Sequence, residues 1–119
     1  MASHFPPAPT PVLTLNSFPK DDAMVIECNG QLVSGTAGEL HSVVKDLFPR
    51  TKHVILDLTG IKQMDSSGLG AIAGLYISAK AIGCRIELIN LSQRVREMMS
   101  LTNLLLLFEP AGQHNIRVG

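Results

Sequence analysis

The stretch HVILDLTGIKQMDSSGLGAIAG, residues 53–74, decides how this chain folds. Residues 52–60 are a nearly continuous run of leucine and β-branched side chains, which is typical of a parallel strand covered on both faces. The segment TGIKQM is expected to be a loop. A helix is expected to begin at Ser66 or Ser67 and to end near Ile82, just before Gly83. A buried strand followed by a long helix indicates an α/β fold.

Similar elements are expected on both sides of this unit. Further strands are predicted at 11–18, 23–28, 84–90 and 104–110, and further helices at 36–47 and 92–101. The polar turn KDD joins the first two strands into a hairpin, and prolines favour an edge position for the first strand. The order β-β-α-β-α-β-α-β predicts a small, mostly parallel mixed sheet with helices packed against it.

Capping patterns mark the ends of the other two helices. Thr36, followed three residues later by Glu39, forms a capping-box pattern, and Pro49 is expected to end that helix. Ser92 is expected to cap the third helix, and Asn103 is expected to stop it in a left-handed conformation.

Composition limits the class of protein. The 119 residues include ten basic and ten acidic side chains, and 45% of the chain is hydrophobic. We expect one folded domain, with no charge that would attract nucleic acid and no apolar run of the roughly 20 residues needed to span a membrane. Four prolines in residues 1–11 predict a flexible arm. We expect a soluble, cytoplasmic protein in which Cys28 and Cys84 are buried and reduced.

The start of the long helix is the candidate site. The N–H groups of a first helical turn favour anions, so a phosphate on Ser66 is well placed there. Leu69, Ala73 and Tyr76 form a stripe on the same side as Ser66, which is either edge packing or a partner surface. The adjoining stripe, expected to face the core, consists of Gly68, Ile72, Leu75, Ala79 and Ile82.

No enzyme pattern fits this site. GLGAIAG has the wrong glycine spacing for a dinucleotide fingerprint, and Asn90 stands where the following strand would end in an acid. The serine-hydrolase elbow needs glycines on both sides of its nucleophile, and Gln63 and Met64 are incompatible with that pattern. The histidines have no metal-ligand spacing, and no phosphate-binding glycine–lysine loop is present. The sequence therefore predicts no catalyst, cofactor or metal.

The segment VILDLTGIKQMDSSGLGAIAGLYISAKAIGCRIELINLSQRVREMMSLTNL resembles the STAS domain family of sulphate transporters and anti-sigma factor antagonists. The strand–DSSGLG–helix element is its most specific part. The likeness extends over about residues 12–109, which implies a STAS domain at 12–119 after the arm. The sheet-and-helix fold implied by the family agrees with the order of elements given above.

The resemblance implies partner switching in bacterial transcription regulation. The phosphorylated serine of the antagonist branch corresponds to Ser66, with Asp65, Ser67 and Gly68 flanking it. An anti-sigma factor serine kinase would bind the unphosphorylated chain, with Leu69, Ala73 and Tyr76 beside the site. Phosphorylation would end this binding, and a phosphatase would restore it. The chain would then be a phosphoprotein and a substrate, not an enzyme.

One departure from the family and two alternatives stay open. Gln31 and Val33 stand where antagonists commonly carry acids, which removes polar contacts to a kinase or its metal. A non-switched STAS scaffold, in a stress-signalling complex or a lipid-transport ABC system, would use the Leu69–Tyr76 face permanently. A small-ligand or nucleotide sensor has only the loose glycine spacing in its favour.

Overall fold

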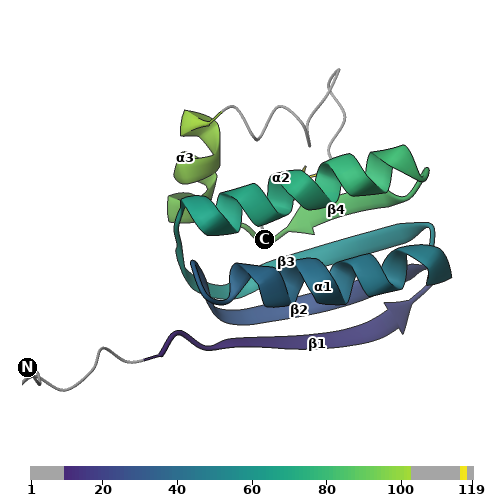
Figure 1. Ribbon diagram of the computed structural model, residues 1–119, viewed down its shortest axis with the longest axis horizontal. Helices are drawn as coiled ribbons and strands as arrows, with labels where there is room; N and C mark the ends of the chain where they lie inside the picture. The colour runs from purple at the N-terminus through teal and green to yellow at the C-terminus, as the bar shows by residue number, and fades with distance from the viewer. Residues whose placement is uncertain (1–9, 103–115, 118–119) are drawn as a thin grey trace, which may run out of the picture.

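The computed structural model describes residues 10–102 and 116–117, and Figure 1 shows a sheet covered by helices. The elements in chain order are β1 (Leu13–Lys20), β2 (Ala23–Leu32), α1 (Ala37–Leu47), the short 3-10 helix η1 (Phe48–Arg50), β3 (His53–Met64), α2 (Ser66–Ala81), β4 (Arg85–Ile89), α3 (Gln93–Leu101) and β5 (Ile116–Arg117). The sheet order is β1-β2-β3-β4-β5. Only β1 and β2 are antiparallel. This confirms the predicted fold class.

The predicted hairpin is confirmed at the edge of the sheet. β1 and β2 pair from Leu13 opposite Gly30 to Lys20 opposite Ala23. The turn between them places Asp21 at a φ of 55°, a left-handed conformation that Asp tolerates better than most residues. The strand expected at 104–110 and the stop expected at Asn103 lie outside the described residues.

β2 and β3 run farther than predicted. β2 continues past Cys28 to Leu32, and β3 continues through TGIKQM to Met64. The two extensions pair with each other across two register shifts. The predicted loop was wrong because Gly60 is a point of close approach, not a break in the strand. A Cβ at Gly60 would lie 1.8 Å from Oδ1 of Asn29, so the missing side chain makes room within the ladder.

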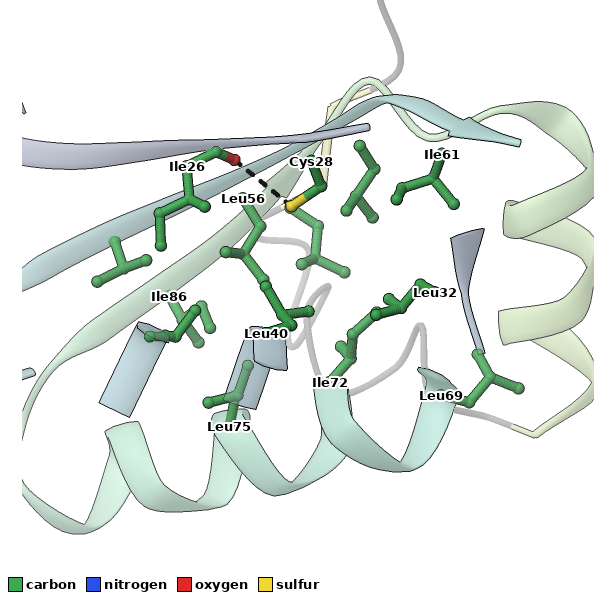
Figure 2. Packing of buried hydrophobic residues seen from close by; sticks show 14 of the residues in the cluster. Ile26, Cys28, Leu32, Leu40, Leu56, Ile61, Leu69, Ile72, Leu75 and Ile86 are labelled. Atoms are coloured by element: carbon green, nitrogen blue, oxygen red, sulfur yellow. Dashed lines mark hydrogen bonds between the residues drawn. The ribbon is translucent and has the colours of Figure 1, made fainter. Parts of the chain in front are cut away.

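α1 and α2 lie next to each other over the same face of the sheet (Figure 1). Together with the sheet they enclose a single core, part of which is drawn in Figure 2. Its largest fully buried side chains are Ile26, Leu32, Leu40, Leu56, Leu58, Ile72, Leu75, Leu88 and Met99. Along β3, buried Leu56 alternates with half-buried Ile55 and Asp57. The second face of this strand is therefore only partly covered, contrary to the prediction.

The helix predictions have mixed outcomes. Ser92 caps α3 by accepting a hydrogen bond from the N–H of Val95 at 3.1 Å, as predicted. Ile82 does not belong to the core face of α2, because it follows the last helical residue and is 58% exposed. Cys28 and Cys84 are buried free cysteines, as predicted. Burial, and secondarily the charge of Asp57, raises the pKa of Cys28 to about 12.

Candidate functional site

The site lies where β3 ends and α2 begins. Met64, the last residue of β3, is buried, and Asp65 follows in an extended conformation. Ser66 is the first residue of α2, and both Ser66 and Ser67 are exposed. The buried anchor before the turn and the core-packed helix after it fix the backbone of this serine pair. Ser66 is thus an exposed hydroxyl on a rigid support.

Asp65 holds the start of α2 together. Its Oδ1 accepts hydrogen bonds from the backbone N–H groups of Ser67, at 2.8 Å, and Gly68, at 3.2 Å. Its Oδ2 accepts one from the N–H of Ser34 at 3.1 Å. The bond from Ser34 is the largest influence on its pKa, and together with those from Gly68 and Ser67 it keeps the pKa below the ordinary 3.8. A carboxylate that is ionised at neutral pH therefore occupies donors at this helix start.

The Ser34 contact links the site to the turn between β2 and α1. Thr36 supports that turn from inside: its hydroxyl donates to the carbonyl oxygen of Gln31 at 2.7 Å and accepts from the N–H of Val33 at 3.0 Å. Thr36 is 2% exposed and makes no side-chain cap to α1. The capping-box prediction was therefore wrong, because the buried backbone groups of the turn take up the hydroxyl.

The two positions at which the family resemblance implied acids are occupied by neutral residues here. Gln31 is half-buried, and its Nε2 donates to Oε1 of Gln63 at 3.0 Å across the β2–β3 ladder. Val33 is 8% exposed and is enclosed by the protein. A neutral amide pair and a buried valine therefore stand near the serine turn, and Asp65 is the carboxylate that the turn itself supplies.

Gly68 is required by the packing of the helix start. A Cβ on Gly68 would lie 2.3 Å from the carbonyl oxygen of Leu32, well inside contact distance. The same carbonyl accepts from the N–H of Asp65 at 3.3 Å. The first turn of α2 thus sits directly on the end of β2, and this contact fixes the height of Ser66 above the sheet.

The predicted partner stripe along α2 is only partly accessible. Leu69 is 8% exposed and belongs to the core, and Figure 2 shows it at the end of the cluster near α3. Ala73 and Tyr76 are half-buried. Leu69 therefore contributes to packing, as the edge-packing alternative predicted, and its role as a partner contact stays a prediction, whereas its two neighbours keep an outward surface.

Sequence reasoning missed an exposed apolar part of α2. Gly70 is exposed with open space above it, and Ile77 is 65% exposed. Together with Ala73 they form an outward strip, called the α2 strip below. The signal was available in the sequence, because Lys80 is the only charged residue in this helix. A helix whose solvent side carries a single charge, in its last turn, indicates a surface for a partner.

Two negative findings apply to residues 10–102 and 116–117. No three His, Cys, Asp or Glu side chains in these ranges converge as metal ligands would. None of the helices in the same ranges is both long enough and apolar enough to cross a membrane.

The sequence matches the model of the STAS domain family over residues 18–116. The fold is similar to that of an anti-sigma factor antagonist from Mycobacterium paratuberculosis, with a TM-score of 0.72 and 20% identity over 82% of each chain. The antagonist SpoIIAA in its unphosphorylated form has a TM-score of 0.61 and 21% identity, over 76% of this chain and 83% of that one.

The Bacillus cell fate determinant SpoIIAA in its phosphorylated form has a TM-score of 0.62 and 21% identity, over 78% of this chain and 85% of that one. At these identities the likeness concerns the fold.

Proposed function

Because the chain belongs to the STAS domain family, we propose that it is an anti-sigma factor antagonist whose binding to a serine-kinase anti-sigma factor is controlled at Ser66. The observation that carries this proposal is an exposed serine on a fixed turn, at the end of an outward helix strip without charge. In this role the chain is a substrate of the kinase and of a phosphatase, not a catalyst.

Docking is the first half of the proposed switch. The kinase would cover Ser66 together with the α2 strip, burying Ile77 and the half-buried Ala73 and Tyr76. Burial of such apolar surface contributes about 25 cal/mol for each Å² removed from water. The small side chains of the strip allow close approach of a partner backbone. Ser66 then lies at the rim of the contact. Because its hydroxyl carries no charge and can keep its hydrogen bonds there, covering it costs little free energy.

Repulsion is the second half. A phosphate on Ser66 would add about −1.5 to −2 charge beside the ionised Asp65. Asp65 already uses the N–H groups of Ser67 and Gly68, so the phosphate would find fewer free donors at this helix start than the sequence led us to expect. It would instead project into the contact area, where burying an uncompensated charge costs several kcal/mol.

We expect this switch to act on a preformed surface. The phosphorylated and unphosphorylated forms of SpoIIAA both share the present fold, with TM-scores of 0.62 and 0.61. A mechanism in which phosphorylation changes the charge of that surface, and not the fold, is compatible with this likeness. The neutral Gln31–Gln63 pair fits the same view, because any metal for phosphoryl transfer would arrive with the kinase.

The test compares charge at two adjacent exposed serines. Wild-type chain, Ser66→Ala, Ser66→Glu and Ser67→Glu are immobilised, and the anti-sigma factor kinase of the source organism is titrated against each. We expect Ser66→Ala to keep the wild-type affinity and Ser66→Glu to lose at least about tenfold, roughly 1.4 kcal/mol. Ser67→Glu, which carries the same charge one position along, should lose less. Intact mass after incubation with kinase and ATP should show one phosphate, absent from Ser66→Ala.

A permanent scaffold gives the opposite result. If Ser66→Glu binds as tightly as wild type while Ile77→Asp loses binding, the α2 strip is a docking surface without a switch. If neither substitution changes binding, the strip is not the interface and the proposal fails.

A further inference from the structure

The outer edge of β1 has no partner strand among the described residues. β1 is the first strand of the sheet and pairs only with β2. The N–H of Gln31 donates to the carbonyl oxygen of Val12, which shows that even-numbered residues of β1 turn their backbone groups toward β2. Odd-numbered residues, including Leu13, Leu15 and Ser17, therefore direct their N–H and C=O groups outward.

The central part of this edge lacks the usual protection against strand pairing. Edge strands are commonly guarded by charged side chains, prolines or bulges. Residues 12–18, VLTLNSF, contain no charge and no proline, and their pairing with β2 is regular. Pro11 and Pro19 flank the segment at odd positions, where a missing N–H faces outward and does not disturb the β1–β2 ladder.

An apolar groove runs along the same edge between β1 and α1. It measures about 560 Å³ and is lined by Leu13, Leu15, Gly38, Glu39, Ser42 and Val43. Leu13 and Leu15 are only half-buried, although they pack against the core. On the opposite face of the strand, Val12 is 64% exposed. Both faces of this edge thus hold apolar surface that a further strand would cover.

We propose that two copies of this chain associate through β1, antiparallel and with a two-fold axis at Leu15. In this register Leu13 of one copy stands opposite Ser17 of the other, and all the outward N–H and C=O groups of residues 13, 15 and 17 find partners. Pro11 stands opposite Pro19, so the pairing ends where donors are missing on both strands.

The same register accounts for the exposed side chains. Val12 of one copy lies opposite Phe18 of the other, a β-branched and aromatic pair of the kind that stabilises neighbouring strands. The two Leu15 side chains meet at the two-fold axis, beside both grooves. No charged residue faces another within 12–18. This self-complementarity identifies a second copy as the occupant, because an isologous contact requires one patch to fit itself.

The dimer leaves the proposed function intact. α2 packs over β3 and β4 and against α1, away from the β1 edge (Figure 1). Both copies therefore present Ser66 and the α2 strip, which would make the antagonist bivalent toward a kinase. We expect the contact area of one strand and one groove to be smaller than the roughly 800 Å² per partner of a stable interface, and the association therefore to be reversible and micromolar.

Sedimentation over a range of concentrations tests the proposal on the full chain. Wild type should pass from monomer to dimer with rising concentration, and Ser17→Ala should behave alike because it keeps its N–H. Ser17→Pro removes one outward donor and places a ring in the contact, while the β1–β2 ladder does not use that N–H. It should stay monomeric with a circular dichroism spectrum and a Tm close to those of Ser17→Ala.

A crosslink tests the register independently. Leu15→Cys should form an intermolecular disulfide on oxidation, because paired residues at the two-fold axis have Cα atoms about 5.5 Å apart. Ser17→Cys should not form this disulfide, because residue 17 of one copy lies opposite Leu13 of the other and the two introduced thiols are several residues apart. The natural Cys28 and Cys84 are buried and do not compete. A wild type that stays monomeric at every concentration, a dimer unaffected by Ser17→Pro, or equal crosslinking of both cysteine variants overturns the proposal.

Discussion

The turns after β2 and after β3 open onto α1 and α2 at the same end of the sheet, yet they treat their hydroxyl groups in opposite ways. Thr36, at the start of α1, is 2% exposed and bonds the backbone of its own turn. Ser66, at the start of α2, is exposed. The residue that caps α2 is Asp65, whereas α1 has no side-chain cap.

The difference shows how a modifiable hydroxyl is kept free. A serine or threonine at the N-cap position accepts a backbone hydrogen bond, which constrains its oxygen. In α2 the side chain of Asp65 accepts such hydrogen bonds, so the side chain of Ser66 is not needed to hold the helix start. Thr36 stabilises the turn after β2, and Asp65 also accepts a hydrogen bond from the N–H of Ser34 in that turn. One turn is therefore a support, and the other presents the site that rests on it.

The largest expected effect comes from breaking the contact between the end of β2 and the start of α2. Gly68→Ala places a Cβ 2.3 Å from the carbonyl oxygen of Leu32. This oxygen belongs to the backbone, so it cannot move aside as the end of a flexible side chain can. We expect a loss of about 2–3 kcal/mol in the free energy of unfolding, measured with urea. The matched control is Gly70→Ala, two residues along the same helix.

Open space surrounds Gly70, so alanine there should stabilise the chain by up to about 1 kcal/mol through helix propensity alone. Equal effects of the two substitutions on the free energy of unfolding would show that the end of β2 and the start of α2 do not touch as described.

A smaller effect is expected from Thr36→Val, which keeps the shape of the side chain and removes its hydroxyl. The N–H of Val33 then loses its acceptor inside the protein, at a cost of about 1–3 kcal/mol. Ser66→Ala, the same loss on the exposed turn, should change the free energy of unfolding by less than about 0.5 kcal/mol. Comparable losses in urea titrations of the two variants would contradict the contrast between the buried and the exposed hydroxyl.

The sequence predicted the order of elements better than their ends. The leucine and β-branched run at 52–60 located the central strand, and the polar turn located the hairpin. The extensions to Leu32 and Met64 were missed because Gly30 and Gly60 look like breaks. In fact Gly30 has a φ of 114° and lies against the carbonyl oxygen of Val12, so close approach between strands, invisible in one segment, governs both positions.

At the site, local signals succeeded and tertiary ones failed. The pattern after β3 placed the start of α2 at Ser66 or Ser67, and the helix begins at Ser66. The spacing of Thr36 and Glu39 matched a capping box, but buried carbonyl groups from the preceding turn took the hydroxyl instead. Leu69 shares a helical stripe with Ser66, and packing at the end of the core covers it. Which side of a stripe is covered depends on neighbours that helical periodicity does not specify.

A loss smaller than that of Thr36→Val is expected from Asp65→Asn, which tests the carboxylate that joins the two turns. Asparagine still caps a helix, but an amide nitrogen cannot accept from Ser34, so we expect a loss of about 0.5–1 kcal/mol at neutral pH. Because the folded pKa of Asp65 lies below its ordinary 3.8, its contribution is complete above that value and disappears as the pH falls through the lowered folded pKa.

Urea titrations across this acidic range should therefore show the wild-type advantage over Asp65→Asn shrinking toward zero as the pH falls.

Asp57→Asn is the matched control. Burial raises the pKa of Asp57, but hydrogen bonds from Thr59 and Asn90 outweigh it and lower that pKa as well. Asp57 lies away from both turns, so its replacement should leave the binding of a kinase unchanged, whereas Asp65→Asn should weaken it by loosening Ser66. A wild-type advantage that stays constant with pH would mean that the charge of Asp65 does not hold the turns together.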